Sequence, residues 1–403
     1  MNEWHYDKIG NLCSAIFSGG TPSTAHEEYW NGGLYWLSSG ETCHRYIFST
    51  EKTITQEGAD NSSTKLAKAG DVVIASAGQG KTRGQVSVVK ADMYINQSVI
   101  AMRGYCGKLD NNFLLYNLKM RYEELRTMSD SSSTRGSITT DMLKKLPILI
   151  PDLPTQERIA DILSAYDDLI ENNNRRIALL EKAARELYKE WFVRFRFPGY
   201  ETANFKGGLP VGWDEVRLNE IIEFNPSLKS PKTHMYKSVP MSALSTSSMI
   251  IDSSQIEITD HLTGSRFQNG DTLLARITPC LENGKTGFVQ CLDSNEVAGG
   301  STEFIVMRSK KLNPYLVYFI ARNETFRDYA IASMNGADGR QRVKPDCLEK
   351  LHWLLPKSDI IDAFEENVSE SFKCIQILSD KNRNLAKQRD LLLPRLMSGM
   401  LEV

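Results

Sequence analysis

The chain contains two copies of one sequence pattern, and this internal repeat limits its fold more than any other feature. KAGDVVIASAGQGKTRGQVSVV (68–89) and QNGDTLLARITPCLENGKTGFV (268–289) each place Gly-Asp before an apolar run and Gly-Lys-Thr before a second β-prone run. Each segment predicts a strand, a turn and a strand. Farther along, six pairs of residues keep one separation of 205 residues (340 − 135): Arg135, Ile138, Asp141, Leu143, Leu146 and Pro151 match Arg340, Val343, Asp346, Leu348, Leu351 and Pro356. A chance match would not hold this register, so the sequence predicts two globular domains of the same fold.

A long helical pattern follows each copy, over about 154–195 and 360–397. Apolar residues recur in steps of three and four, which is typical of a coiled-coil seam. The first seam comprises Ile159, Leu163, Tyr166, Ile170, Ile177, Leu180 and Leu187, and the second comprises Phe364, Val368, Ile375, Leu378, Leu385 and Leu392. About 40 residues would form a rod of roughly 60 Å. We expect the two helices to pack antiparallel, and Pro394 to kink or end the second near its close.

Two asparagines occupy seam positions in these helices. A single polar residue at such a position can fix the register of paired helices at some cost in stability. Asn173 and Asn382 could serve this purpose, or they could be solvated where the helices separate. The sequence leaves both interpretations open.

The repeat and the helices together predict an α+β protein with a pseudo-two-fold internal repeat. We expect a first mixed α/β domain over 1–152, a first long helix over 153–197, a linker and second domain over 198–357, and a second helix with a C-terminal tail over 358–403. The length of 403 residues agrees, because a single core stops growing near roughly 250–300 residues. The segment 195–213 is rich in Gly, Pro and aromatic residues and is interpreted as the linker.

Composition predicts a soluble, cytoplasmic protein. The N-terminal residues do not form a signal peptide, and no apolar run reaches the roughly 18 residues of a membrane helix. The seven cysteines are scattered without a C-x-x-C pair, which is typical of a reducing compartment. Cys43 and His44 are the one Cys-His neighbour pair, and no second ligand pair has metal-site spacing, so we expect no metal site.

Motifs for catalysis are incomplete in this sequence, so we expect no catalytic residue. Gly80-Lys81-Thr82 precedes a strand pattern, whereas a phosphate-binding loop must lead into a helix. A DNA methyltransferase needs Asn/Asp-Pro-Pro-aromatic, and the segments beginning at Asn225 and Asn313 lack the second proline. Pro151-Asp152 opens a helix, where Asp serves as a cap.

Polar and basic residues on the predicted turns are better explained as DNA contacts, because such side chains reach phosphates and base edges. The candidates are Ser18, Gly19, Gly20, Thr21, Lys81, Thr82, Arg83, Ser133 and Arg135 in the first copy, and Lys229, Lys232, Arg276, Lys285, Arg340, Gln341 and Arg342 in the second. The plainer interpretation of any one of them is a solvated surface residue. The net charge of −2 argues against a DNA-binding protein that acts alone.

Several segments together resemble the specificity subunit of type I restriction-modification systems over essentially the whole chain. PDLPTQERIADILSAYDDLIENNNRRIALLEKAARELYKEWF is similar to the family's first helical spacer, and FRFPGYE and GLPVGW to its inter-domain linker. QRDLLLPRLMSGMLEV resembles its C-terminal tail, and FSGGTPS and WLSSGE resemble its target-recognition signatures. In the second copy NPSLKSPK replaces the Gly-Gly-Thr-Pro signature, which implies a different half-site.

The resemblance implies a division of labour. Each target recognition domain would read one half of a split, asymmetric site in double-stranded DNA, and the paired helices would set the unread gap. Two methyltransferase subunits would supply S-adenosylmethionine chemistry at adenine N6. Restriction subunits would add translocation and cleavage driven by ATP with Mg²⁺, and no cofactor would bind this chain. The alternatives are a DNA-binding regulator that acts alone and a coiled-coil scaffold without a DNA role.

Overall fold

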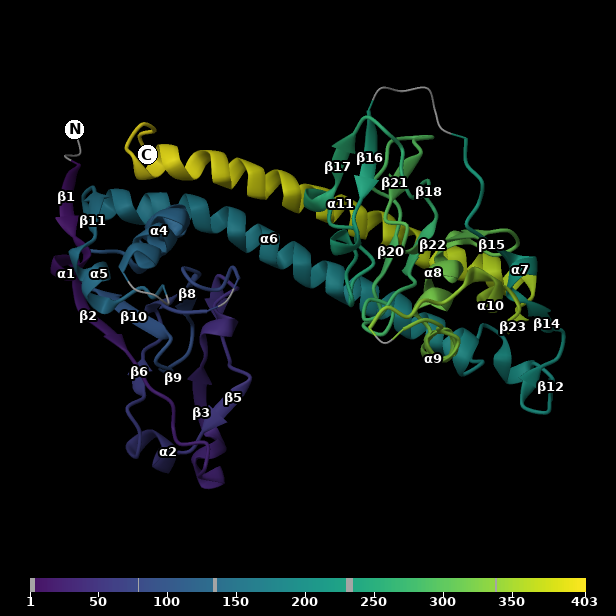
Figure 1. Cartoon of the computed structure of the whole chain (residues 1–403), viewed down its shortest axis with the longest axis horizontal. Coiled ribbons are helices and arrows are strands. Elements are labelled where there is room, and N and C mark those ends of the chain that lie inside the picture. The colour runs from purple at the N-terminus through teal and green to yellow at the C-terminus, as the bar shows by residue number, and fades with distance from the viewer. Residues whose placement is uncertain (1–3, 79, 133–135, 230–234, 338) are drawn as a thin grey trace. The chain divides into compact units, whose positions relative to one another are not determined.

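The computed structural model describes residues 4–78, 80–132, 136–229, 235–337 and 339–403, which form two compact units. Unit 1 comprises residues 1–170 and 384–403, and unit 2 comprises residues 171–383. The two long helices, α6 (Leu153–Tyr188) and α11 (Ser358–Met397), each contribute residues to both units (Figure 1).

Unit 1 contains three sheets. A five-stranded sheet has the order β2-β10-β7-β8-β4, a four-stranded sheet has the order β5-β3-β9-β6, and β1 pairs with β11. The strands are β1 (His5–Lys8), β2 (Cys13–Ser18), β3 (Trp30–Leu37), β4 (Tyr46–Ile47), β5 (Lys52–Ile54), β6 (Lys65–Ala67), β7 (Val72–Ala75), β8 (Val86–Val89), β9 (Met93–Ile95), β10 (Val99–Gly104) and β11 (Pro147–Ile150). The helices are α1 (Ile9–Leu12), α2 (Gln56–Asp60), α3 (Asn111–Met120), α4 (Tyr122–Ser132) and α5 (Thr140–Lys145), with 3-10 turns η1 (Glu27–Tyr29) and η2 (Ser39–Glu41).

Unit 2 repeats these sheets in the same order, except that its first sheet has four strands and lacks a counterpart of β4. Its sheets are β15-β22-β19-β20, β17-β16-β21-β18 and β14-β23, and a small hairpin β12-β13 precedes them. The strands are β12 (Phe205–Lys206), β13 (Leu209–Pro210), β14 (Asp214–Arg217), β15 (Ile222–Phe224), β16 (Tyr236–Val239), β17 (Glu257–Thr259), β18 (Ser265–Phe267), β19 (Thr272–Ala275), β20 (Thr286–Phe288), β21 (Ala298–Gly300), β22 (Phe304–Ser309) and β23 (His352–Leu355). The helices are α7 (Leu218–Ile221), α8 (Pro314–Arg322), α9 (Glu324–Ala332) and α10 (Pro345–Glu349), with short turns η3 (Lys189–Val193), η4 (Tyr200–Thr202), η5 (Met241–Ala243) and η6 (Ser253–Gln255). The duplication predicted from the sequence is therefore present at the level of strand order.

The repeated Gly-Asp motif forms the same ion pair in both units. Asp71 accepts two hydrogen bonds of 2.7 Å from Arg103, and Asp271 accepts two of 2.7 Å from Arg308. Both carboxylates are almost fully buried, whereas the arginines remain partly exposed. Burial raises the pKa of Asp271, and its arginine partner opposes this effect. Each pair joins the start of one central strand to the end of its neighbour, because β7 pairs with β10 and β19 with β22.

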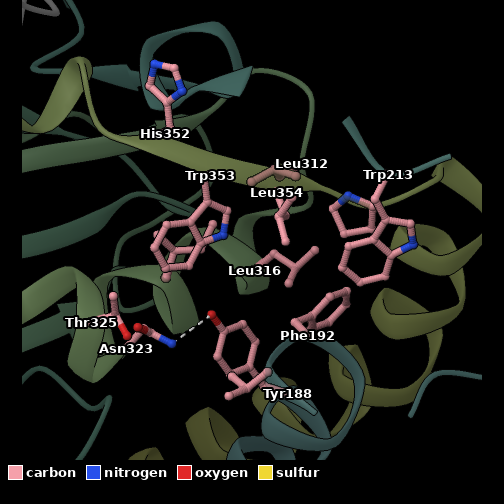
Figure 2. A pocket seen from close by; sticks show the side chains of 13 residues that line it. Tyr188, Phe192, Trp213, Leu312, Leu316, Asn323, Thr325, His352, Trp353 and Leu354 are labelled. Atoms are coloured by element: carbon pink, nitrogen blue, oxygen red, sulfur yellow. Dashed lines mark hydrogen bonds between the residues drawn. The ribbon is translucent and has the colours of Figure 1, made fainter. Parts of the chain in front are cut away.

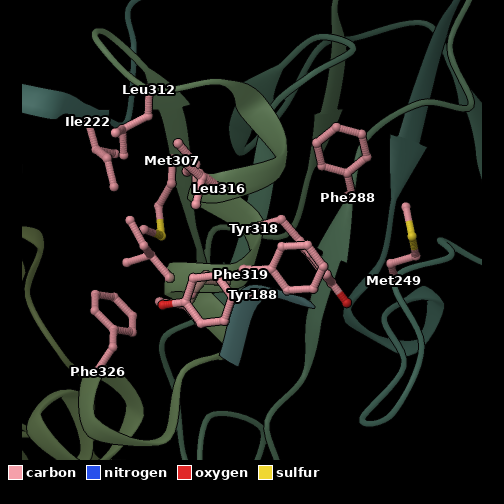
Figure 3. Close-up of a cluster of buried hydrophobic side chains, with 14 of the residues drawn as sticks. Tyr188, Ile222, Met249, Phe288, Met307, Leu312, Leu316, Tyr318, Phe319 and Phe326 are labelled. Carbon is pink, nitrogen blue, oxygen red and sulfur yellow. The ribbon is translucent and has the colours of Figure 1, made fainter. Parts of the chain in front are cut away.

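Aromatic side chains from several elements fill the core of unit 2 (Figure 3). Tyr188 of α6 stacks on Phe319 of α8 with ring centroids 5.3 Å apart. Phe288 of β20 lies edge-on to Phe372 of α11 at 5.1 Å. Such pairs add stabilisation beyond the area that they bury. The long helices are thus part of the domain core in unit 2.

The helices pack antiparallel within unit 2. Trp191, which follows α6 in the η3 turn, lies 5.8 Å from Phe364 near the start of α11. Farther back along α6, Asn173 donates a 2.8 Å hydrogen bond to Asn382, and Asn382 donates one of 2.8 Å to Asn174. Of the two interpretations of the seam asparagines, the structure therefore shows the paired one. The seam residues Ile177, Leu180, Leu187, Phe364, Val368, Ile375 and Leu378 all belong to the unit 2 core or pack against it.

In unit 1 the helix ends contribute to a second core. Ile159 and Leu163 of α6 are fully buried in a cluster that also contains Leu396, and Leu392 packs against it. Tyr166, Ile170 and Leu385 are half-buried. Asp167, which is 8% exposed, accepts a hydrogen bond of 2.8 Å from Tyr116 and pairs with Arg389 of α11 and Lys119 of α3. Burial would raise the pKa of Asp167, but Lys119 and Arg389 together outweigh burial and lower it.

The structure adds detail at two boundaries. α11 ends at Met397, just after Pro394, which agrees with a proline near the close of the helix. In the segment 195–213, predicted as the linker, Phe195 and Phe197 pack on Trp213 with ring centroids 5.5 and 5.4 Å away. Within the described residues, no helix has the length and apolar character that crossing a membrane requires.

Candidate nucleic-acid interface

Four loop segments of unit 1 meet at one end of the five-stranded sheet. β10 pairs antiparallel with both β2 and β7, so the ends of β2 and β7 lie beside the start of β10. Ser76 after β7 donates a 2.8 Å hydrogen bond to the carbonyl of Ser98, and its own carbonyl accepts one of 2.9 Å from the backbone N–H of Ile138. We call the segments 18–21, 76–78, 80–85, 96–98 and 136–138 the first sheet end.

The turn between β7 and β8 is held by one face of α4. Tyr122 donates to the carbonyl of Lys81 at 2.8 Å, and Arg126 donates to the carbonyl of Gly80 at 2.8 Å. Asp130, one helical turn farther on, receives a 2.6 Å hydrogen bond from Arg83. The prediction that Arg83 is exposed is wrong: it is 9% exposed and also donates to a backbone carbonyl at residue 136. Lys81 remains exposed, and Thr82 is half-buried.

The glycines of the Ser18–Thr21 loop serve backbone packing. Gly19 and Gly20 donate their N–H groups to the carbonyls of Asn96 and Ile95. A Cβ atom on Gly19 would lie 1.8 Å from the Ile95 carbonyl oxygen, so no larger residue fits without a shift. These two N–H groups are therefore already used within the unit and are not available to bind a phosphate. Ser18 is half-buried, and the exposed Thr21 donates to Gln97 at 2.5 Å.

Unit 2 has the matching arrangement. Arg276 after β19 donates its backbone N–H to the carbonyl of Glu303 at 2.9 Å, and its carbonyl accepts from the N–H of Val343 at 3.0 Å. Thr278 and Gln341 exchange two further hydrogen bonds of 3.0 and 3.1 Å. We call the segments 225–229, 276–285, 301–303 and 339–343 the second sheet end. In each unit the predicted turn after the central strand and the predicted loop near Arg135 or Arg340 are thus brought together.

The hydrogen bonds identify equivalent positions in the two units, and the side chains there differ in charge. Ser76, Ser98 and Ser137 of the first sheet end correspond to Arg276, Glu303 and Arg342 of the second. Arg342 binds the Glu303 carboxylate through Nε and Nη2 at 2.8–2.9 Å, and Arg276 Nε lies 3.9 Å from the same group. The hydrogen bond from Arg342 lowers the pKa of Glu303, although burial opposes this. Glu303 is not among the residues predicted from the sequence, because an isolated acidic residue has no sequence pattern that indicates a site.

The other candidates of unit 2 have mixed environments. Arg340 and Lys229 are exposed, whereas Gln341 is half-buried. Lys285 donates to the carbonyl of Met241 at 3.0 Å, so its ammonium is only partly available. Ser133, Arg135 and Lys232 lie outside the described residues.

Comparison with known proteins assigns the family. A family model described as the type I restriction modification DNA specificity domain matches residues 1–182. The type I restriction enzyme MjaIX specificity subunit of Methanocaldococcus jannaschii is 25% identical over 418 residues, which cover 100% of this chain and 94% of that protein. Residues 1–182 therefore match the DNA specificity domain of type I restriction-modification systems, and the whole chain is similar to specificity subunits of such systems. This similarity supports recognition of DNA sequence within a restriction-modification system.

Two further proteins are similar to this chain. The EcoAI specificity subunit of Escherichia coli is 30% identical over 252 residues, covering 60% of this chain and 37% of that protein. A crystal structure of the type I restriction-modification S subunit from M. genitalium has a TM-score of 0.61 at 14% identity and covers 98% of this chain and 96% of that one. The similarity to the M. genitalium structure shows a shared fold.

The signature motifs of the specificity subunit contact one another inside unit 1. Trp36 of the WLSSGE motif donates from Nε1 to the carbonyl of Gly20 in the FSGGTPS motif at 3.2 Å. Glu41 of the same motif accepts hydrogen bonds from the backbone of Ser38 and Glu51 at 3.2 and 2.9 Å. These motifs therefore shape the first sheet end.

The near-matches to catalytic motifs have structural roles in this chain. Asn225 accepts a hydrogen bond of 2.9 Å from the backbone of Val306, and Asn313 caps α8. Asp152 accepts from the backbone of Thr155 at the start of α6, as predicted for a cap. β8 follows the Gly-Lys-Thr turn, which confirms the predicted strand and excludes a phosphate-binding loop there. Among the described residues, no group of three His, Cys, Asp or Glu side chains could hold a metal ion.

Unit 2 also contains an apolar cavity of about 300 Å³ (Figure 2). Its walls include Tyr188, Phe192, Trp213 and Trp353, and neither lysine nor arginine lines it. The hydroxyl of Tyr188 accepts a hydrogen bond of 3.4 Å from Asn323 at its edge. None of its lining residues lies in the four segments of the second sheet end, so this cavity is separate from the candidate nucleic-acid interface.

Proposed function

We propose that the chain reads a bipartite, asymmetric site in double-stranded DNA, with one half-site read by each sheet end. One observation carries this proposal: the two units repeat the same loop architecture but carry different side chains at equivalent positions. Identical scaffolds with Ser76, Ser98 and Ser137 in one unit and Arg276, Glu303 and Arg342 in the other would recognise different bases. Duplication without this difference would favour a symmetric site.

The long helices are proposed to set the gap between the half-sites. α6 has 36 residues and α11 has 40, which correspond to about 54 and 60 Å of helix. Half-sites read from one face of DNA must lie about one helical turn, or a multiple of it, apart. The antiparallel contacts within unit 2 and the Asn173–Asn382 hydrogen bond would fix the register on which that distance depends.

The chemistry is assigned to partner subunits. We propose two methyltransferase subunits that use S-adenosylmethionine to modify adenine N6, and restriction subunits that use ATP and Mg²⁺ for translocation and cleavage. The net charge of −2 supports such an assembly, because a protein that bound DNA alone would need more cationic surface. At the second sheet end, Glu303 already neutralises part of the positive charge of two arginines.

Co-expression with its methyltransferase subunits tests the proposal. Methylated adenines mapped across a genome should define one split site with two different halves and a constant gap. A continuous site, a symmetric site or no methylation would contradict the proposal. Gel shifts of the isolated chain address the alternative of a regulator that acts alone, since tight sequence-specific binding without partners would favour that alternative.

A further inference from the structure

The second sheet end contains an arginine whose side chain is held in one orientation. Arg342 Nε donates to both oxygens of Glu303 at 2.9 Å, and its Nη2 donates to Oε1 at 2.8 Å. Its Nη1 donates to the carbonyl of Arg340 at 3.2 Å. The backbone of Arg342 is fixed as well, because its N–H and carbonyl both pair with Asn335 at 3.0 Å. The side chain is nevertheless 40% exposed.

This arrangement leaves a specific part of the guanidinium available. An arginine has five N–H donors, and the pair with Glu303 uses the edge formed by Nε and Nη2. One hydrogen on Nη1 is used by Arg340, so one hydrogen on each terminal nitrogen remains. If Arg340 takes the Nη1 hydrogen on the Cδ side, the two remaining hydrogens form the end of the fork, and such a pair of donors matches the O6 and N7 acceptors of guanine in the major groove.

The surrounding charges favour this orientation. The Glu303 carboxylate lies between Arg342 and Arg276, whose Nε is buried and has no hydrogen-bond partner among the described residues. Two guanidinium groups around one carboxylate leave a net positive charge at a partly exposed site. Holding an arginine in place before binding also reduces the rotamer entropy that is lost when it contacts a base.

The first sheet end does not have this arrangement. The positions equivalent to Arg276, Glu303 and Arg342 are Ser76, Ser98 and Ser137, and their hydroxyl groups cannot form a two-donor fork. A base contact made by the arginine would therefore belong to one half-site only. This agrees with the asymmetric site proposed above.

We propose that Arg342, positioned by Glu303, reads a guanine in the half-site recognised by unit 2. The inference rests on the proposed function and adds a base and two residues to it. Arg342 would make the base contact, and Glu303 would be a positioning residue that does not touch the base itself.

The test maps methylated sites for the chain co-expressed with its methyltransferase subunits, with Arg342→Gln, Arg342→Lys and Glu303→Gln variants. Arg342→Gln should accept other bases at one guanine position, with a loss of discrimination of about 5- to 150-fold there. Arg342→Lys should relax the same position despite keeping its charge, because lysine lacks the fork. Glu303→Gln should relax it by a smaller factor.

Arg121 provides a matched control. It forms the same side-on pair with Glu124 at 2.6 Å and donates from Nη1 to the carbonyl of Pro147, but it lies outside both sheet ends. Arg121→Gln should leave every position of the site unchanged. Thermal unfolding of each variant shows whether a lost signal reflects loss of the fold, and the lysine and Glu303 variants then carry the test.

The outcomes separate the two proposals. A wild-type site that is not split contradicts the proposed function itself. A split site that has no guanine in either strand of the half read by unit 2 overturns only the present inference. So does a base profile that Arg342→Gln and Arg342→Lys leave unchanged, or one in which Glu303→Gln weakens both half-sites equally.

Discussion

Removing one heptad from both long helices should shorten the gap in the recognised site. The segments Ile170–Arg176 of α6 and Ser379–Leu385 of α11 lie opposite each other, because Asn173 in the first bonds to Asn382 in the second. Deleting both segments removes both partners of that polar contact, so no buried amide is left unpaired. Seven residues correspond to about 10 Å of helix and change the angular position of later residues by only about 20°.

This length equals about three base pairs at 3.4 Å each. Each base pair removed from the gap also rotates one half-site around the DNA axis relative to the other, so removal of fewer base pairs keeps both half-sites closer to one face of the DNA. The methylated sites of the deletion variant, mapped after co-expression with the methyltransferase subunits, should keep both half-sites with a gap shorter by about one to three base pairs. A double variant with alanine in place of the exposed Arg176 and Lys381, which lie in the same two segments, keeps the helix length and the seam contacts and should keep the gap. An unchanged gap, or altered half-sites, in the deletion variant would refute the reasoning.

Three further predictions concern stability. Gly19→Ala should destabilise the fold by about 1–3 kcal/mol through overpacking against a backbone carbonyl, whereas Gly33→Ala, which meets no atom within 4 Å, should have little effect; equal unfolding midpoints would contradict this. Asp71→Asn should lower the free energy of unfolding by about 3 kcal/mol, because it leaves Arg103 without a charged partner. Removal of an exposed ion pair such as Glu370–Lys373 should lower it by less than about 1 kcal/mol, and chemical denaturation measures both. The lowered pKa of Asp167 means that the folded state binds fewer protons, so its contribution is present above about pH 4 and is lost as the pH falls through the folded pKa. Unfolding midpoints between about pH 5 and pH 2.5 should therefore fall less steeply in Asp167→Asn than in the wild type, and parallel curves would show that this carboxylate is not involved.

The repeat could be predicted from the sequence because its positions are fixed by backbone geometry. The Gly-Asp motifs recur because each buried carboxylate must meet an arginine on the neighbouring strand, as Asp71 meets Arg103. The residues 205 positions apart match because they occupy equivalent places: Ile138 and Val343 each make the same backbone hydrogen bond at their sheet end. Helical periodicity identified the long helices for a similar reason, since the buried face of a helix repeats at a regular interval.

The properties of individual side chains at the sheet ends could not be predicted in the same way. Arg83 was expected to be exposed because it follows a Gly-Lys-Thr turn, but its exposure depends on α4, which lies about 40 residues away in the sequence. Glu303 acquires its role only through contacts with arginines 27 and 39 residues away (303 − 276 and 342 − 303). Glycines in the Ser18–Thr21 loop could serve a local turn or a close approach to another segment. The sequence does not separate these two reasons, whereas the contact with Ile95 in the structure shows the close approach.

A domain exchange tests the central claim most directly. Residues 1–150 of this chain would be replaced by the first domain of another family member with a known site, and methylated adenines would be mapped after co-expression with the methyltransferase subunits. We expect one half of the site to become that of the donor, while the other half and the gap stay as they were. A chimera that folds and modifies DNA but changes both halves, or neither, would contradict independent reading by the two units.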